Sequence, residues 1–204
     1  MSLQPVSIKL LLLKLMLWIP ISFAIWYFTY PALLYLSSIL VNISLPFISN
    51  HIIDTTQLNR DNISLDIITN FIDLIPNDPT GKKGKMAFTI HVMKYGYGLA
   101  LFIALVLSSF GSYKIKIRNI LLGILLVSII QLWGISFEVY KNLIYEMGTK
   151  VYNHIAPSVL LEEFIKLGYF LGILIIPAVA PVALWFSLYK KVYVISKGMF
   201  YTKL

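Results

Sequence analysis

The chain has 204 residues, of which 58% are hydrophobic and 13% are charged, and its 17 basic and 9 acidic residues give a net charge of +8. A soluble domain carries about 25% charged residues, so this composition excludes an ordinary soluble domain and a disordered protein and predicts several membrane spans. Because the sequence has no cysteine, disulfides, thiolate metal ligands and cysteine nucleophiles are also excluded.

Four apolar stretches have the character of membrane spans, since crossing a bilayer as a helix takes about 20 residues. They lie at residues 8–30, 95–110, 119–140 and 165–189. The first stretch has a longer apolar run than a signal peptide, and no small-x-small cleavage site follows it. We therefore expect it to remain in the chain as a transmembrane helix.

Pro31 follows the first stretch, and proline is favoured in the first turn of a helix. We expect the helix to bend or restart at Pro31 and to continue as an outer helix that Pro46 ends. An alternative makes residues 31–49 a fifth span. That alternative would place the basic loop at residues 111–118 outside the cell, against the rule that lysine and arginine favour the cytoplasmic side.

The distribution of charge predicts the orientation. One side, which holds both termini and the loop at residues 111–118, carries nine basic residues and no acidic one. The opposite side and the span ends that face it carry the other eight basic residues and all nine acidic ones. An excess of lysine and arginine marks the cytoplasmic side, so we expect both termini to be cytoplasmic.

Residues 50–94 form the longest soluble segment, and apolar residues alternate with polar ones in two parts of it. Ile63, Leu65 and Ile67 share a face in the first part, and four residues do so in the second: Met86, Phe88, Ile90 and Val92. A period of two indicates half-buried strands, so we expect an antiparallel sheet of two or three strands. The basic run at residues 82–85 suits its solvated tip, with an anionic-lipid contact as the alternative.

Residues 142–164 form a second outer segment that mixes apolar and charged residues. We expect an extension of the third helix, a turn near Ala156 and Pro157, and then a new helix. Ser158 is a suitable N-cap for that helix, and Glu162 in its first turn suits the positive end of the helix dipole.

Glu138 is the first candidate functional residue. It lies about 28 Å along a helix from Asn119, at 1.5 Å per residue, which places it near the outer membrane boundary. A carboxylate at that depth is costly unless it is paired or hydrated, so it is a candidate for function. Lys141 lies on the same face three residues later, and Gln131 precedes Glu138 on the same span. The alternative is an interfacial ion pair that only sets the depth of the helix.

The segment at residues 94–98, Lys-Tyr-Gly-Tyr-Gly, joins the last predicted strand to the second span. Lys94 reaches Glu138 if the second and third spans are neighbours. Tyr95 and Tyr97 also suit an interfacial aromatic belt, which is the alternative interpretation. The glycines allow a close approach of the backbone.

The fourth span contains residues that favour helix packing and bending. Gly168 and Gly172 form a small-xxx-small pair, and Pro177 and Pro181 are expected to kink the helix. The three histidines lie far apart in outer segments without metal-ligand spacing. We therefore predict no metal site and no cofactor, and assign no catalytic residue.

The order of these motifs resembles a known family. They are residues 17–20 with 26–27, residues 94–99, residues 131–134 with 137–138, and residues 168–172 with 177–181. Together they resemble the small membrane proteins associated with exosortase H in bacteria. Exosortases are multi-span transpeptidases that process proteins with C-terminal sorting tails by means of cysteine, arginine and histidine. Because this chain has no cysteine, the resemblance implies an accessory protein in the bacterial inner membrane.

We predict an all-α membrane protein, a four-span transmembrane helical bundle with a small antiparallel β element on the extracytoplasmic side. Its expected segments are the first span with an outer helix (1–49), an extracytoplasmic β segment (50–94), two spans joined by a basic cytoplasmic loop (95–141), an outer connection (142–164), and the fourth span with a basic cytoplasmic tail (165–204).

The expected function is that of a non-enzymatic inner-membrane accessory of an exosortase-type protein-sorting system. It would present an extracytoplasmic platform to a partner enzyme or a substrate tail, with membrane lipids as further partners and no nucleic acid. One alternative is an intramembrane hydrolase or transferase that uses Glu138. Another is a subunit of a small-solute transporter, although Ser128 and Gln131 offer few polar groups at the midplane.

Overall fold

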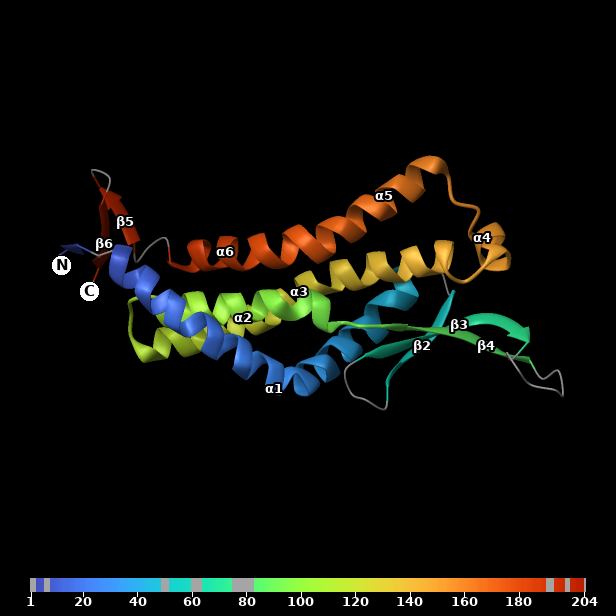
Figure 1. Cartoon of the computed structure of the whole chain (residues 1–204), viewed down its shortest axis with the longest axis horizontal. Helices are drawn as coiled ribbons and strands as arrows, with labels where there is room; N and C mark the ends of the chain where they lie inside the picture. The colour runs from blue at the N-terminus through green and yellow to red at the C-terminus, as the bar shows by residue number, and fades with distance from the viewer. Residues whose placement is uncertain are drawn as a thin grey trace. The chain divides into compact units, whose positions relative to one another are not determined.

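The computed structural model describes residues 3–5, 8–48, 52–59, 64–74, 83–189, 193–196 and 199–203. The chain divides into two compact units. The first unit comprises Met1–Thr29, Gly96–Ile130 and Ile175–Leu204, and the second comprises Tyr30–Tyr95 and Gln131–Leu174. Figure 1 labels most of the helices and strands of the two units.

Among the described residues, three helices are long and apolar enough to cross a membrane: Lys9–Leu45 within α1 (Ile8–Ile48), the whole of α3 (Tyr113–Tyr145), and the continuous helix Val159–Tyr189. Helix α2 (Met93–Ser108) is also apolar but has only 16 residues. That length corresponds to about 24 Å, against about 30 Å for the hydrocarbon core of a bilayer. The protein is therefore mostly helical with three candidate spans, and a fourth span at α2 remains a prediction.

Helix α1 is one continuous helix of 41 residues that runs through Pro31. The helix therefore does not restart at Pro31, whereas the expected bend at this residue and the alternative of a fifth span remain predictions. Pro46 lies two residues before the last helical residue, Ile48. In the second unit, one face of α1 is buried, with Leu34, Val41 and Leu45 at most 1% exposed.

Strands β2 (Ile53–Leu58), β3 (Leu65–Leu74) and β4 (Lys83–Ile90) form a three-stranded antiparallel sheet in the order β2-β3-β4 (Figure 1). This confirms the predicted small sheet. Leu65 and Ile67 of β3 are fully buried and pair with Ile90 and Phe88 of β4. The predicted alternation in β4 is also present, because every second side chain from Met86 to Ile90 is less exposed than its neighbours. Ile63 lies outside the described residues.

Asn42 joins α1 to the sheet. Its side-chain Nδ2 donates to the carbonyl oxygen of Thr56 at 3.2 Å, and its Oδ1 accepts from the backbone N–H of Thr56 at 2.9 Å. An amide side chain has the same donor and acceptor groups as a backbone peptide. Asn42 thus satisfies the backbone of β2 and fixes the position of α1 on the strand.

The outer connection contains α4 (Thr149–Ile155), which the sequence did not indicate, and then α5 (Val159–Phe170). Ala156 adopts a left-handed conformation with φ 43° at the turn between them. The Oγ of Ser158 accepts from the N–H of Leu161 at 3.3 Å, which confirms the predicted N-cap. Helix α5 continues through a π-helical turn, η1 (Leu171–Ile175), into α6 (Ile176–Tyr189).

The first unit has its own apolar core. Phe102 and Val106 of α2 and Tyr189 of α6 are fully buried, and the partly buried side chains packed against them are Ile120, Leu184, Trp185 and Leu188. In addition, β1 (Leu3–Pro5), β6 (Met199–Lys203) and β5 (Tyr193–Ser196) form a second antiparallel sheet in the order β1-β6-β5. The C-terminal segment was expected to be a basic tail, and no strand was predicted at either end of the chain.

Candidate functional site

The candidate site lies in the second unit, where β4 leads into α2. The strand ends at Ile90, and the N–H of Tyr95 donates to the carbonyl oxygen of Val92 at 3.0 Å in the first turn of the helix. This turn places Lys94 and Tyr95 at the start of α2, where both side chains meet Glu138 of α3.

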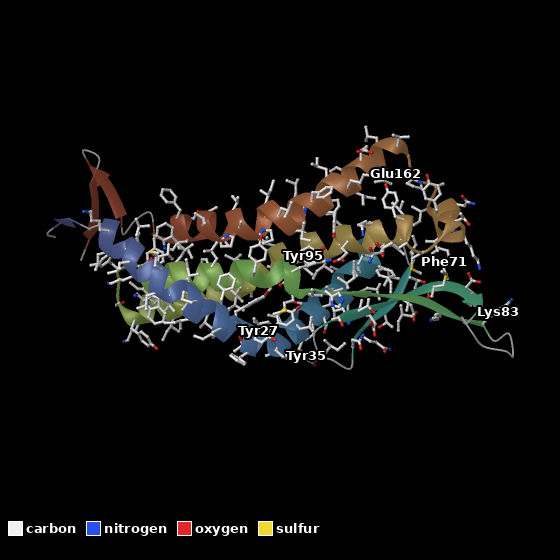
Figure 2. The ribbon with its side chains drawn as sticks, viewed as in Figure 1. Tyr27, Tyr35, Phe71, Lys83, Tyr95 and Glu162 are labelled. Carbon is white, nitrogen blue, oxygen red and sulfur yellow. The ribbon has the colours of Figure 1, made fainter. Side chains whose placement is uncertain are left out.

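Both oxygens of Glu138 are engaged. Lys94 Nζ donates a charge-assisted hydrogen bond to Oε1 of Glu138, forming an ion pair. The hydroxyl of Tyr95, a residue labelled in Figure 2, donates to Oε2 at 2.8 Å. Glu138 and Tyr95 are only 6% and 2% exposed. A buried carboxylate is tolerated when it is paired and hydrogen-bonded, and these two partners meet that requirement.

Gly134 makes room for this arrangement. It lies one helical turn before Glu138 on α3, and a Cβ atom at this position would lie 2.3 Å from Cδ1 of Tyr95. Any side chain here would therefore overlap the tyrosine ring. Because the ring lies directly over the glycine, its hydroxyl group can reach Glu138.

Lys141 does not pair with Glu138. Its Nζ forms an ion pair with Oε1 of Glu146 at 2.6 Å and lies 3.4 Å from Oδ1 of Asn142. Lys141 therefore pairs with Glu146, five residues later, and not with Glu138, three residues before it. Lys94 and Lys141 nevertheless lie near the same aromatic ring, because their Nζ atoms are 5.8 Å and 5.2 Å from the ring centre of Tyr169. The sequence analysis did not select Tyr169, whose only signal was its position beside Gly168.

Gln131 bonds to a backbone group of the turn before α2. Nε2 of Gln131 donates to the carbonyl oxygen of Val92 at 3.3 Å. Gln131 therefore supports the turn that carries Lys94. Tyr97 is half-buried and belongs to the first unit. Of the six predicted polar residues, the structure thus brings together Glu138, Lys94 and Tyr95.

The predicted glycine pair of the fourth span faces α3. A Cβ at Gly168 would lie 2.2 Å from Cε1 of Phe137, and one at Gly172 would lie 2.7 Å from Cα of Gly134. Nε1 of Trp133 also donates to the carbonyl oxygen of Gly168 at 3.2 Å. The absence of side chains therefore allows the backbones of α3 and the α5–η1 segment to approach closely, as small residues do between membrane helices.

The prolines of α6 belong to the first unit, where both are buried. Pro181 has no N–H to donate to the carbonyl oxygen of Pro177. That oxygen faces α2 instead, since a Cβ at Gly98 would lie 2.4 Å from it. The π-helical turn η1 immediately precedes this pair, and such turns are a recognised cause of helix bending.

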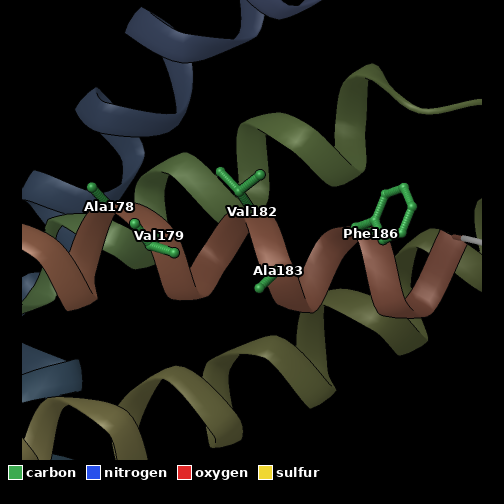
Figure 3. Close-up of a pocket in the computed structure, with 5 residues that line it drawn as sticks. All are labelled: Ala178, Val179, Val182, Ala183 and Phe186. Atoms are coloured by element: carbon green, nitrogen blue, oxygen red, sulfur yellow. The ribbon is translucent and has the colours of Figure 1, made fainter.

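The described residues offer no metal centre, because they contain no group of three or more His, Asp or Glu placed to hold an ion. His91 is exposed, and the His154 ring packs edge-on against Phe71 with ring centres 5.1 Å apart. His51 lies outside the described residues. A surface hollow on α6 presents only apolar side chains, those of Ala178, Val179, Val182, Ala183 and Phe186 (Figure 3).

Comparison with known proteins gives one match. Residues 5–192 match the family described as exosortase H-associated membrane protein. The chain belongs to this family. No curated protein and no solved structure matches it. The family description agrees with the three long apolar helices, so this exosortase H-associated chain is a membrane protein, and the resemblance noted from its sequence motifs is confirmed.

Proposed function

We propose that this chain is a non-enzymatic accessory of an exosortase-type protein-sorting system in the bacterial inner membrane. In this proposal it crosses the membrane four times, with α2 as the fourth span and both termini in the cytoplasm. Its second unit is the extracytoplasmic platform, which binds the partner enzyme or the sorting tail of a substrate. The observation that carries the proposal is the family match over residues 5–192.

The charge of the two units supports this orientation. The first unit contains nine basic residues and no acidic residue, whereas the second contains eight basic and all nine acidic residues. The boundary between the compact units therefore coincides with the charge boundary expected from the positive-inside rule. Under that rule the first unit holds the cytoplasmic ends, and the sheet β2-β3-β4 belongs to the opposite side.

The environment of Glu138 supports an architectural role. A general base or nucleophile needs an oxygen that can reach a substrate, but Lys94 and Tyr95 engage both oxygens of this carboxylate. The same two bonds fasten the start of α2, and therefore the end of β4, to α3. Glu138 thus holds the sheet in a fixed position on the helices, as a binding platform requires.

The second unit also has apolar surface suited to a partner. At the start of α5, Val159 and Leu160 are 80% and 83% exposed, and Phe164 is 53% exposed. They lie beside Glu162, labelled in Figure 2, whose carboxylate accepts from the hydroxyls of Tyr145 and Tyr152 at 3.1 Å and 2.8 Å. Grouped exposed apolar side chains mark sites of contact with another protein or with a membrane, and we assign this group to the partner.

The proposal is tested in cells that lack this gene and express a reporter protein with a sorting tail. We expect the reporter to remain unprocessed and the intact chain to restore processing. A tagged chain should also co-purify with the exosortase. A V159S/L160S variant should lose both properties at a normal protein level, with the change L167S on the same helix as the matched control. Normal processing without the chain, combined with no co-purification, would contradict the proposal.

A further inference from the structure

The first unit carries a concentration of positive charge that no carboxylate among the described side chains pairs with. All nine of its charged residues are basic. Five of these have described side chains: Lys9, Lys14, Lys114, Lys116 and Arg118. The four ion pairs formed by described side chains include none of the five. The counter-charge for this unit must therefore come from outside the described chain.

Two of these ammonium groups lie against the end of α2 and the residues that follow it. Lys14 of α1 has its Nζ 4.5 Å from the ring centre of Phe110. Lys116 of α3 donates from Nζ to the carbonyl oxygen of Leu107 at 2.8 Å, in the last turn of α2. Helices α1 and α3 thus each place a positive charge at the end of α2, an arrangement that an anion would stabilise.

The surrounding surface matches a membrane interface. Along the first turns of α3, the basic residues Lys114 and Arg118 are exposed. Between and beside them lie apolar side chains that are also exposed, with Tyr113 at 75% and Ile117 at 43%. Basic groups interleaved with an aromatic and aliphatic side chains contact lipid phosphates and acyl chains together.

We propose that this surface, formed by Lys14, Lys114, Lys116 and Arg118, binds the headgroups of anionic phospholipids. The ligand chemistry is a phosphate diester with net negative charge, such as phosphatidylglycerol, held by ammonium and guanidinium groups. This binding is separate from the partner platform of the second unit and does not depend on which reaction the partner performs.

The test uses the full chain in micelles of a neutral detergent with equal amounts of phosphatidylglycerol and phosphatidylcholine, and native mass spectrometry counts the bound lipids. We expect a preference for phosphatidylglycerol. The K114Q/R118Q variant should lower its affinity by about fivefold per charge removed, or on the order of twentyfold together, as expected for basic residues near an anionic surface. The charge-preserving K114R/R118K variant should bind as the parent does.

The matched control is K150Q/K166Q, which removes two charges from α4 and α5 in the second unit. It should leave the lipid preference unchanged. Inorganic phosphate at millimolar concentration should not displace the lipid, because the apolar contacts contribute to binding. Three results would each overturn the proposal. They are equal binding of the two lipids, an equal loss of phosphatidylglycerol affinity in K114Q/R118Q and in the control variant, and displacement of the lipid by phosphate.

Discussion

The ion pair between Lys94 and Glu138 lends itself to a double-mutant cycle. The changes are Glu138→Gln, Lys94→Gln and the two together. The Glu138 side chain is 7% exposed and that of Lys94 is 31% exposed. Glutamine at position 138 keeps an oxygen that can accept from Tyr95, so the single change removes charge and little else. It leaves the ammonium of Lys94 without its partner in a partly buried place.

The expected magnitude follows from these exposures. Removing one partner of a fully buried ion pair costs about 3–5 kcal/mol. Because a third of the Lys94 side chain still meets solvent, we expect about 2 kcal/mol for each single variant. The double variant leaves no unpaired charge, so it should also lose about 2 kcal/mol. The coupling energy between the two positions is therefore about 2 kcal/mol.

The assay is equilibrium unfolding in mixed micelles with increasing denaturing detergent, followed by tryptophan fluorescence. The chain offers a matched control in the pair of Lys141 and Glu146, which has the same residue types but is 30% and 54% exposed. Its cycle should give a coupling of no more than about 1 kcal/mol. Equal coupling in the two cycles, or additive losses at Lys94 and Glu138, would show that burial does not strengthen this pair.

Three further outcomes are expected. Gly172→Ala places a methyl group 2.7 Å from Cα of Gly134 and should lower the free energy of unfolding by about 1–3 kcal/mol, measured by the same assay; an unchanged value would argue against the close approach. Asn42→Ala should expose the Thr56 amide to hydrogen exchange, whereas Asn42→Asp, which keeps the acceptor, should retain more protection; equal exchange in the two variants contradicts this role. Reporter fusions should place the C-terminus in the cytoplasm and Gly81 on the extracytoplasmic side of the membrane. The reverse result would reject the charge-based orientation.

Much of the secondary structure could be predicted from the sequence because it depends on local patterns. Long apolar runs predicted the helices that begin near Ile8 and end near Tyr189. Alternation predicted β4, since neighbouring side chains on a strand point to opposite faces. Ser158 caps α5 by accepting a hydrogen bond from the N–H of Leu161, three residues later. Each of these features depends on residues within a few positions of one another, so the sequence carries the signal directly.

The partner of Glu138 was decided by tertiary structure. Lys141 is closer in sequence and shares a helix face with Glu138, yet it bonds to Glu146, while Lys94 bonds to Glu138 from 44 residues away. Which lysine reaches the carboxylate depends on how α2 packs against α3. That packing depends on Gly134, where the missing side chain leaves space for the Tyr95 ring.

Tertiary structure also decided the strands at the two ends of the chain. Leu3 pairs with Lys203 in the register of β1 and β6, and no local pattern in either segment specifies a partner so far away in sequence. A strand becomes stable when its backbone groups find hydrogen-bonding partners. The sequence by itself therefore determined which segments are apolar, which alternate and where the charge lies. Only the tertiary structure decided which distant segments meet, because pairing and packing depend on the space that both partners leave for each other.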